Sequence, residues 1–310
     1  MSRPLSTRRS NWFTGTGRGN RVVTVQRQLH YRSGSTISRP WSLEITTARA
    51  GWTWTSMRAI ELGAGQAVTF DTGDEEMVIL SLEGSVQVES DDEGALVEGR
   101  ADVFSGVSDF VYLPRHRTVR LSSERGGRFA LPGAQASSSR HFVYQPKSAI
   151  QVEYRGSGSS SRRVVNFCTT ETFDAERLIA CEVVTPGGNW SSYPPHKHDE
   201  EREGESQLEE IYYFEFDVQS HQGAMGYQRV YGTPERPIDV LTEVRNGDVV
   251  LIPHGWHGPT MAAPGYDLYF LNSMAGPGPR AWNICDDPAH AWVRSTWTEL
   301  EFDPRALAPR

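Results

Sequence analysis

The sequence has few cysteines and no long apolar run. Its 310 residues include three cysteines, Cys168, Cys181 and Cys285, an odd number with no Cys-x-x-Cys spacing. These cysteines fit free thiols in a reducing compartment better than a disulfide framework. No window approaches the ~18 consecutive apolar residues that a membrane-spanning helix needs, so we expect no membrane partner.

Lysine is also scarce. Only Lys147 and Lys197 occur, and the net charge is −8. Because nucleic-acid binding requires a basic face, this balance argues against a nucleic-acid partner. The segment Thr7–Phe13 contains an arginine pair like that of an export signal, but the polar, glycine-rich Thr14–Asn20 follows it where such a signal needs an apolar stretch. We therefore predict a cytoplasmic protein.

Glycine and proline, by contrast, are frequent, with 29 and 18 residues, and they recur at short intervals. Short runs of β-branched and aromatic residues lie between them, a pattern typical of an all-β sandwich or barrel. Longer helical periodicity is scarce. The expected strands are Val22–Val25, Ala67–Phe70, Met77–Leu82, Phe110–Leu113, Arg140–Tyr144, Ile179–Val184, Ile211–Phe216, Val249–Ile252 and Tyr266–Leu271.

A stretch of glycine and serine at 155–161 divides the chain almost evenly and is typical of a linker. The two halves also echo each other. Met77–Gly84 and Phe110–Pro114 take the places in the first half that Ile211–Asp217 and Val249–Pro253 take in the second. Two copies of one β-barrel are the simplest account. We predict an N-terminal barrel at 1–155 and a C-terminal barrel at 162–310.

The second half contains a candidate metal site. His196 and His198 are two residues apart, and on a β-strand such residues point to the same face, ~6.6 Å apart. The two imidazoles can therefore converge on one ion, with Lys197 turned the other way. Further ligands should come from neighbouring strands, where Glu210 opens an aromatic run and His257 follows another expected strand.

Two neighbours compete with these ligands. Glu209 precedes Glu210, which we favour because it directly abuts the expected strand. His254 competes with His257, but its place directly after a proline indicates the barrel rim. The acidic insert 199–209 is expected to be a solvated loop, with a lid over the site as the alternative.

Three imidazoles and one carboxylate suit Zn, Mn, Fe(II) or Ni, with one or two positions open to substrate or water. We predict one divalent transition metal, Zn, Mn or Fe. The first half has no His-x-His ahead of Met77 and offers only His116 at the place that His257 takes in the second half. The first barrel is therefore predicted to be metal-free.

The order His-x-His, Glu and distant His resembles the ligand set of a cupin. Gly247–His257 resembles the second cupin motif, except that the histidine comes one residue early. The second half as a whole resembles the cupin-type uronate isomerase family, and within it the 5-deoxy-glucuronate isomerases. The blocks that carry this resemblance are Tyr193–Asp199, Leu208–Phe214, Gly226–Tyr231, Asn246–Pro253, Ala263–Asn272, Met274–Pro277, Arg280–Trp282 and Asp287–Trp292.

The resemblance implies a bicupin that converts 5-deoxy-D-glucuronate to 5-dehydro-2-deoxy-D-gluconate, an aldose–ketose isomerisation of inositol catabolism. Its partner would be a small sugar acid, and a homo-oligomer, most simply a dimer, is expected. Tyr266 and Gln228 lie in the blocks and are the catalytic candidates. Arg280 is the candidate for the substrate carboxylate, with Arg229 as alternative. Two other functions stay open: an Fe(II) cupin dioxygenase with the same ligands, and a non-catalytic sugar-binding bicupin.

Overall fold

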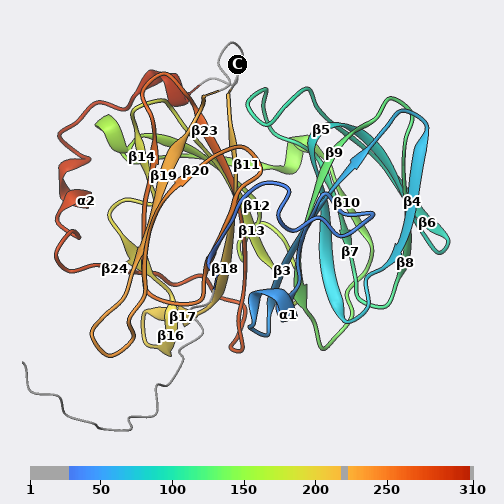
Figure 1. The fold of residues 1–310 in the computed structure, drawn as a ribbon, viewed down its shortest axis with the longest axis horizontal. Helices are drawn as coiled ribbons and strands as arrows, with labels where there is room; N and C mark the ends of the chain where they lie inside the picture. Colours follow the sequence, from blue (N-terminus) through green and yellow to red (C-terminus); the bar gives the residue numbers. More distant parts are fainter. Residues whose placement is uncertain (1–27, 218–222, 308–310) are drawn as a thin grey trace, which may run out of the picture.

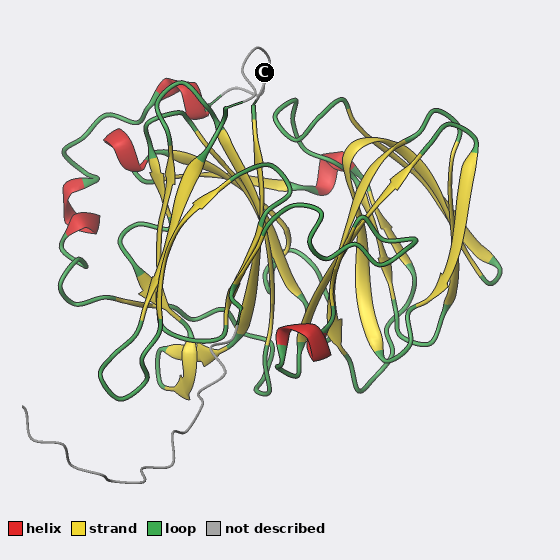
Figure 2. Ribbon diagram, in the orientation of Figure 1, coloured by secondary structure: helices red, strands yellow, loops and turns green. Residues whose placement is uncertain are grey.

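The computed structural model describes residues 28–217 and 223–307. Two rounded β units lie side by side (Figure 1), and helix is confined to short turns (Figure 2). The predicted all-β fold of two barrels with little helix is confirmed. The candidate strand Val22–Val25 and the arginine pair of Thr7–Phe13 lie outside the described residues. None of the described helices is long and apolar enough to cross a membrane.

The first barrel is a single curled sheet of nine strands within the described chain. Its strands are β2 (Leu43–Ile45), β3 (Thr55–Leu62), β4 (Gln66–Asp71), β5 (Glu75–Ser90), β6 (Glu93–Arg100), β7 (Phe110–Leu113), β8 (Thr118–Ser123), β9 (Gly127–Gln135) and β10 (Val143–Gln145). The long β5 pairs with four others, β6 to β9, and so links most strands of this sheet. The short helix α1 (Thr47–Ala50) precedes β3; Thr46 caps its start and Gly51, at φ 67°, ends it.

The second barrel has two larger sheets and a ribbon in its described part. One sheet orders β1 (His30–Tyr31), β21 (Val249–Ile252), β18 (Glu209–Phe216), β23 (Leu268–Ala275), β13 (Ile179–Thr185), β12 (Arg162–Cys168) and β11 (Gln151–Arg155). The other orders β20 (Asp239–Val244), β19 (Gly226–Tyr231), β22 (Trp256–Ala262), β15 (His196–Lys197) and β24 (Cys285–Asp286), with β14 (Trp190–Ser191) on β22. The ribbon is β16 (Asp199–Arg202) and β17 (Glu205–Gln207), and the remaining turns are α2 (Val293–Thr296), η1 (Lys147–Ala149), η2 (Gly158–Ser160) and η3 (Pro304–Ala306).

Strand β18 lies between two hydrophobic cores, because successive side chains of a strand point to opposite faces of the sheet. Tyr212 and Phe214 pack with residues of both sheets inside the second barrel. Ile211 and Tyr213 point the other way, into a cluster shared with the first barrel. Strands of both barrels therefore bury both faces where the barrels meet, which explains their nearly unbroken apolar sequence.

The predicted linker is in fact part of the second barrel. Strands β11 and β12 pair antiparallel on either side of it, with Arg155 opposite Arg162. Gly156 and Gly158 take positive φ angles of 82° and 55° that a tight connection needs, so glycine marks a turn here and not a flexible tether. The chain passes from the first barrel to the second at 146–150, between β10 and β11. We therefore propose that the two barrels divide at 146–150 and not at the predicted 155 and 162. Strand β1 adds an early segment to the second sheet.

The internal repeat predicted from the sequence has a structural counterpart. Strand β5 pairs with β7 so that Met77 lies opposite Leu113, and β18 pairs with β21 so that Glu210 lies opposite Ile252. Met77 therefore occupies in the first barrel the place that Glu210 has in the second, and it is packed in the apolar core there. Among the described residues this place in the first barrel therefore carries a methionine where the second barrel has a carboxylate.

Candidate metal centre and active-site cavity

Three histidines from neighbouring segments meet inside the second barrel. His196 on β15 lies directly opposite His257 on β22, and their ring centroids are 4.4 Å apart. His198, two residues further on, brings its ring centroid to 4.7 Å from that of His257. One nitrogen from each ring lies within 4.8 Å of the others. The spacing predicted from the His-x-His pair therefore brings these three side chains together.

Glu210 projects from β18 into the same group. Its Oε2 is 3.1 Å from Nε2 of His198 and 3.0 Å from Nε2 of His257, and the residue is 2% exposed. Glu209, its competitor, faces the first barrel, where its carboxylate accepts hydrogen bonds from backbone N–H groups of the segment before β3. His254 lies outside the three-histidine group.

Two members of the group, His196 and Glu210, have the protonation states that metal ligands require. Burial, followed by repulsion from His257 and His198, lowers the pKa of His196 well below its usual value, so its ring is neutral. Burial acts to raise the pKa of Glu210, but the facing imidazoles outweigh it and hold that pKa at about 2. An ionised carboxylate beside a neutral imidazole is ready to bind a cation.

The residues fit a divalent cation on structural grounds as well. Nδ1 of His257 lies 3.1 Å from the carbonyl oxygen of Gly255, a contact that orients the ring and leaves Nε2 facing the group. Nδ1 of His198 is buried and makes no hydrogen bond among the described residues, and Nε2 of His257 faces the Glu210 carboxylate at 3.0 Å. Buried ring nitrogens without a partner are costly unless a ligand satisfies them. His196, His198, His257 and Glu210 can together hold one divalent metal ion.

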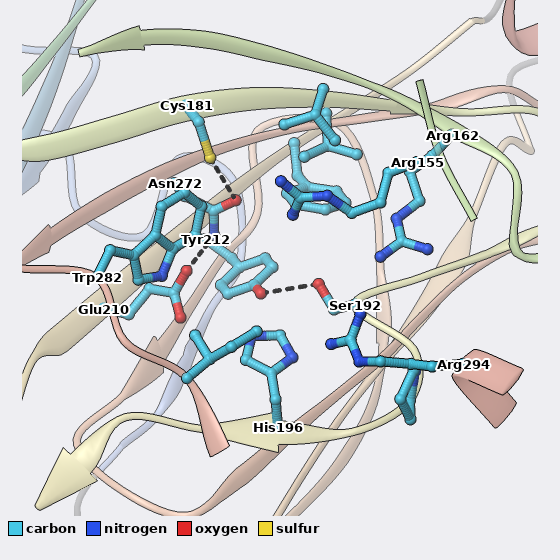
Figure 3. A pocket seen from close by; sticks show the side chains of 15 residues that line it. Arg155, Arg162, Cys181, Ser192, His196, Glu210, Tyr212, Asn272, Trp282 and Arg294 are labelled. Carbon is cyan, nitrogen blue, oxygen red and sulfur yellow. Dashed lines mark hydrogen bonds between the residues drawn. The ribbon is translucent and has the colours of Figure 1, made fainter. Parts of the chain in front are cut away.

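A cavity of about 190 Å³ opens onto this group. His196 and Glu210 form part of its wall, together with Tyr212, Asn272 and Ser192 (Figure 3). The remaining lining residues are Arg155, Arg162, Val164, Cys181, Val183, Pro194, Phe270, Trp282, Ile284 and Arg294. In Figure 3 the three arginines lie on the side opposite Glu210 and Asn272. The cavity is therefore polar at both ends, with a candidate metal centre at one and guanidinium groups at the other.

Asn272 fixes the carboxylate of Glu210, because its side-chain amide donates to Oε1. We expect Asn272→Ala to weaken metal binding roughly 10- to 100-fold, as loss of such outer partners does in metal sites. Titration against a competing chelator measures the change. Asn166→Ala is the matched control, because Asn166 donates to Glu153, outside the four-residue group. Equal metal affinity of the Asn272 variant and the wild type would contradict this role.

The predicted catalytic and substrate residues do not line the cavity. Arg280 donates to the backbone carbonyl oxygens of Leu178, Phe173, Cys168 and Thr169. Its guanidinium thereby holds a loop and does not line the cavity, which favours another residue for the substrate carboxylate. Gln228 is buried on β19 and accepts from Thr260, and Tyr266 packs at the edge of the barrel core. Another residue, one that lines the cavity, is therefore proposed below to act on the substrate.

Lys197 and the acidic insert form a separate network. The Lys197 ammonium donates to Asp199, Glu200 and Glu205, away from the histidines, as strand alternation predicts. The insert is the ribbon β16–β17 and not a purely solvated loop, since Asp199 and Glu205 are buried. This network ties the ribbon to the barrel.

Several residues that line the cavity were not predicted, because their signals in the sequence are weak. Tyr212 and Asn272 lie in strands that bury both faces, so an inward polar group could not be told from an outward one. Ser192 and Arg162 lie beside turns that composition alone marked as loop or linker.

Comparison with known proteins agrees with this architecture. The KduI/IolB family model matches residues 29–293. The chain is 39% identical over 254 residues to the 5-deoxy-glucuronate isomerase of Geobacillus thermodenitrificans (strain NG80-2), covering 81% of this chain and 90% of that protein. It is 35% identical over 254 residues to the 5-deoxy-glucuronate isomerase of Bacillus subtilis (strain 168), covering 81% and 91%.

Solved structures show the same likeness. An IolB-like protein from Salmonella typhimurium LT2 matches with a TM-score of 0.79 and 30% identity, over 86% of this chain and 99% of that one. Oxalate decarboxylase OxdC of Bacillus subtilis matches with a TM-score of 0.57 over 84% of this chain and 79% of its own. At 12% identity this likeness concerns the fold alone, and it agrees with the predicted bicupin fold. The family match and the identity to its members show that this chain belongs to the KduI/IolB family.

Proposed function

We propose that this protein isomerises 5-deoxy-D-glucuronate to 5-dehydro-2-deoxy-D-gluconate, with His196, His198, His257 and Glu210 as the ligands of a divalent metal, Zn, Mn or Fe. The observation that carries the proposal is the four-residue group at one end of a small cavity, in a chain whose relatives are named 5-deoxy-glucuronate isomerase. The reaction is an aldose–ketose isomerisation, so no atom is gained or lost.

The chemistry requires a proton to move from C2 to C1, which places negative charge on the two neighbouring oxygens in the transition state. A divalent cation, when bound by the four side chains, supplies the positive charge that stabilises these oxygens. The chain itself contributes their orientation. Asn272 holds Glu210, and the Gly255 carbonyl oxygen orients His257, so the ligand end of the cavity is fixed before substrate arrives.

Tyr212 replaces Tyr266 and Gln228 as the residue best placed to act on the sugar. Its hydroxyl lies 3.0 Å from that of Ser192, and both residues line the cavity. Burial, followed by repulsion from Glu210, raises the pKa of Tyr212 well above its usual value. The phenol therefore stays protonated and serves as a hydrogen-bond donor to a sugar oxygen, not as the base.

The test is to incubate metal-loaded protein with 5-deoxy-D-glucuronate in D2O and follow the ketose by proton NMR. We expect conversion at the same rate under nitrogen as in air, because isomerisation uses no O2. Deuterium at the carbon that was C1 of the substrate, which is C6 of the product because the product is numbered from its carboxylate, would support a proton transfer through solvent-exchanging groups. Absence of conversion by fully loaded protein would refute the proposal, and an O2-dependent product would favour the dioxygenase alternative.

A cytoplasmic location and a homo-oligomeric state, with a dimer favoured, are part of the same proposal. The three cysteines are free, and Cys168 and Cys181 are buried, which suits a reducing compartment. Equilibrium sedimentation of the purified chain measures the assembly state directly.

A further inference from the structure

The three cavity arginines differ in their ion pairs within the described part of the chain. Arg155 is paired with Glu153 through two hydrogen bonds of 2.8 and 2.6 Å, and Arg294 is paired with Asp286 through two more. Arg162, by contrast, forms no ion pair among the described residues. Its one hydrogen bond there runs 2.9 Å from Nη1 to the carbonyl oxygen of Ser160.

This unpaired guanidinium is also buried. Arg162 is only 5% exposed. A buried charge that forms no ion pair is unfavourable in a folded protein. Burial, followed by repulsion from Arg155 and Arg294, lowers the pKa of Arg162 to about 9. The local environment therefore favours the arrival of an anion, and the cavity is the space in which Arg162 can meet one.

The fold holds this guanidinium in place. It lies over the ring of Trp297, 5.5 Å from the centroid, while Nη1 is held by Ser160. A Cβ at Gly156 would lie 2.8 Å from Nη1 and 2.1 Å from the Ser160 carbonyl oxygen, so only glycine leaves room for the arrangement. Of the five N–H groups of an arginine, one is used here, and the planar fork that is left matches a carboxylate.

We propose that Arg162 binds the carboxylate of the sugar-acid substrate and so selects uronates over neutral sugars. This inference rests on the proposed function, because it requires the reacting end of the same molecule to lie near His196 and Glu210. A chain of six carbons carries its carboxylate at one end and its aldehyde at the other. The cavity has the matching polarity, with guanidinium groups facing the candidate metal centre across it (Figure 3).

The test measures binding by calorimetry to the metal-loaded protein, with D-glucuronate and neutral D-glucose as probes. We expect the wild type to prefer the acid. Arg162→Met should weaken binding of D-glucuronate roughly 30-fold or more, as removal of one partner of a buried charge pair does. Its affinity for D-glucose should not change. Arg162→Lys keeps the charge but not the fork, and should recover part of the preference.

Arg163→Met is the matched control. Arg163 is the next residue of β12, is equally buried and points to the opposite face of the sheet, away from the cavity. This variant should keep the preference for the acid, and thermal unfolding shows whether each variant is folded. If Arg162→Met does not fold, Arg162→Lys tests the proposal instead. Wild-type affinity of Arg162→Lys for D-glucuronate would show that the bidentate fork of the arginine is not used.

The outcomes separate this inference from the proposed function. A wild type that binds both sugars equally, or a folded Arg162→Met that keeps the preference for the acid, would overturn the role of Arg162. A wild type that binds D-glucuronate through Arg162 but never isomerises 5-deoxy-D-glucuronate would refute the isomerase and leave the carboxylate site standing. With an active enzyme, Arg162→Met should raise KM for 5-deoxy-D-glucuronate more than it lowers kcat.

Discussion

Glu210→Gln should reduce isomerase activity by more than about 100-fold and release the metal, with the fold preserved. The amide has nearly the shape of the carboxylate but lacks its charge. Loss of an outer partner of a metal ligand costs about 10- to 100-fold, so loss of a charged ligand itself should cost more. The carboxylate of Glu210 faces Nε2 of both His198 and His257, and nothing else described in the group carries negative charge.

Two measurements check this expectation. Metal content after gel filtration reports retention, and proton NMR reports the rate of ketose formation. His257→Ala should behave like Glu210→Gln, whereas His254→Ala is the matched control, because His254 lies near β22 but outside the three-histidine group. A Glu210→Gln protein with full metal content and wild-type activity would show that the carboxylate is not a ligand.

The sequence alone predicted that the candidate ligands lie together, because their spacing is a local property. A His-x-His pair on a strand fixes two rings on one face whatever surrounds them. The choice of Glu210 over Glu209 also agrees with the structure, but the sequence could not explain it. Both faces of β18 are apolar after that point, so only the packing of Tyr212 inside the barrel and of Tyr213 against the other barrel shows which carboxylate faces inward.

The residues at the other end of the cavity could not be predicted in the same way. Whether an arginine is available to bind a ligand depends on which groups it already contacts, and these groups are distant in sequence. Arg280 looked free but is held by backbone carbonyl oxygens more than a hundred residues away. Arg162 looked like the end of a linker but is a buried strand residue whose unpaired state depends on the turn at Gly156.

Two glutamates of the repeat join the barrels in a symmetric way, although the sequence gives them no special signal. Glu209 accepts from the backbone N–H groups of Thr53, Trp54 and Thr55 at 3.0, 2.7 and 3.1 Å. In the first barrel Glu76, the residue before Met77, takes the place of Glu209. It accepts at 2.6 to 2.9 Å from the backbone N–H groups of three second-barrel residues, which are Glu176, Arg177 and Leu178. Each barrel therefore clamps a loop of the other through one carboxylate.

Glu209→Ala should lower the free energy of unfolding by about 3 to 5 kcal/mol, because it leaves three N–H groups without their charged acceptor at the barrel interface. Glu76→Ala should lower it by at least as much, since Glu76 is more deeply buried and also accepts from Tyr112. Urea unfolding after removal of metal measures both values without a contribution from a bound cation. Glu299→Ala, an exposed glutamate, is the control.

The pair Glu209 and Glu210 then gives a test that neither variant gives alone. Neighbours on one strand point to opposite faces, so the two substitutions should affect different properties. Glu209→Ala should weaken the fold but retain metal. Glu210→Gln should lose metal, while its metal-free form should unfold near the urea concentration at which the metal-free wild type unfolds. If Glu209→Ala instead released metal from folded protein, the interface and the ligand group would be coupled through β18. If it left the unfolding free energy unchanged, the three N–H groups would have found other acceptors, and the barrels would be held together mainly by the apolar cluster they share.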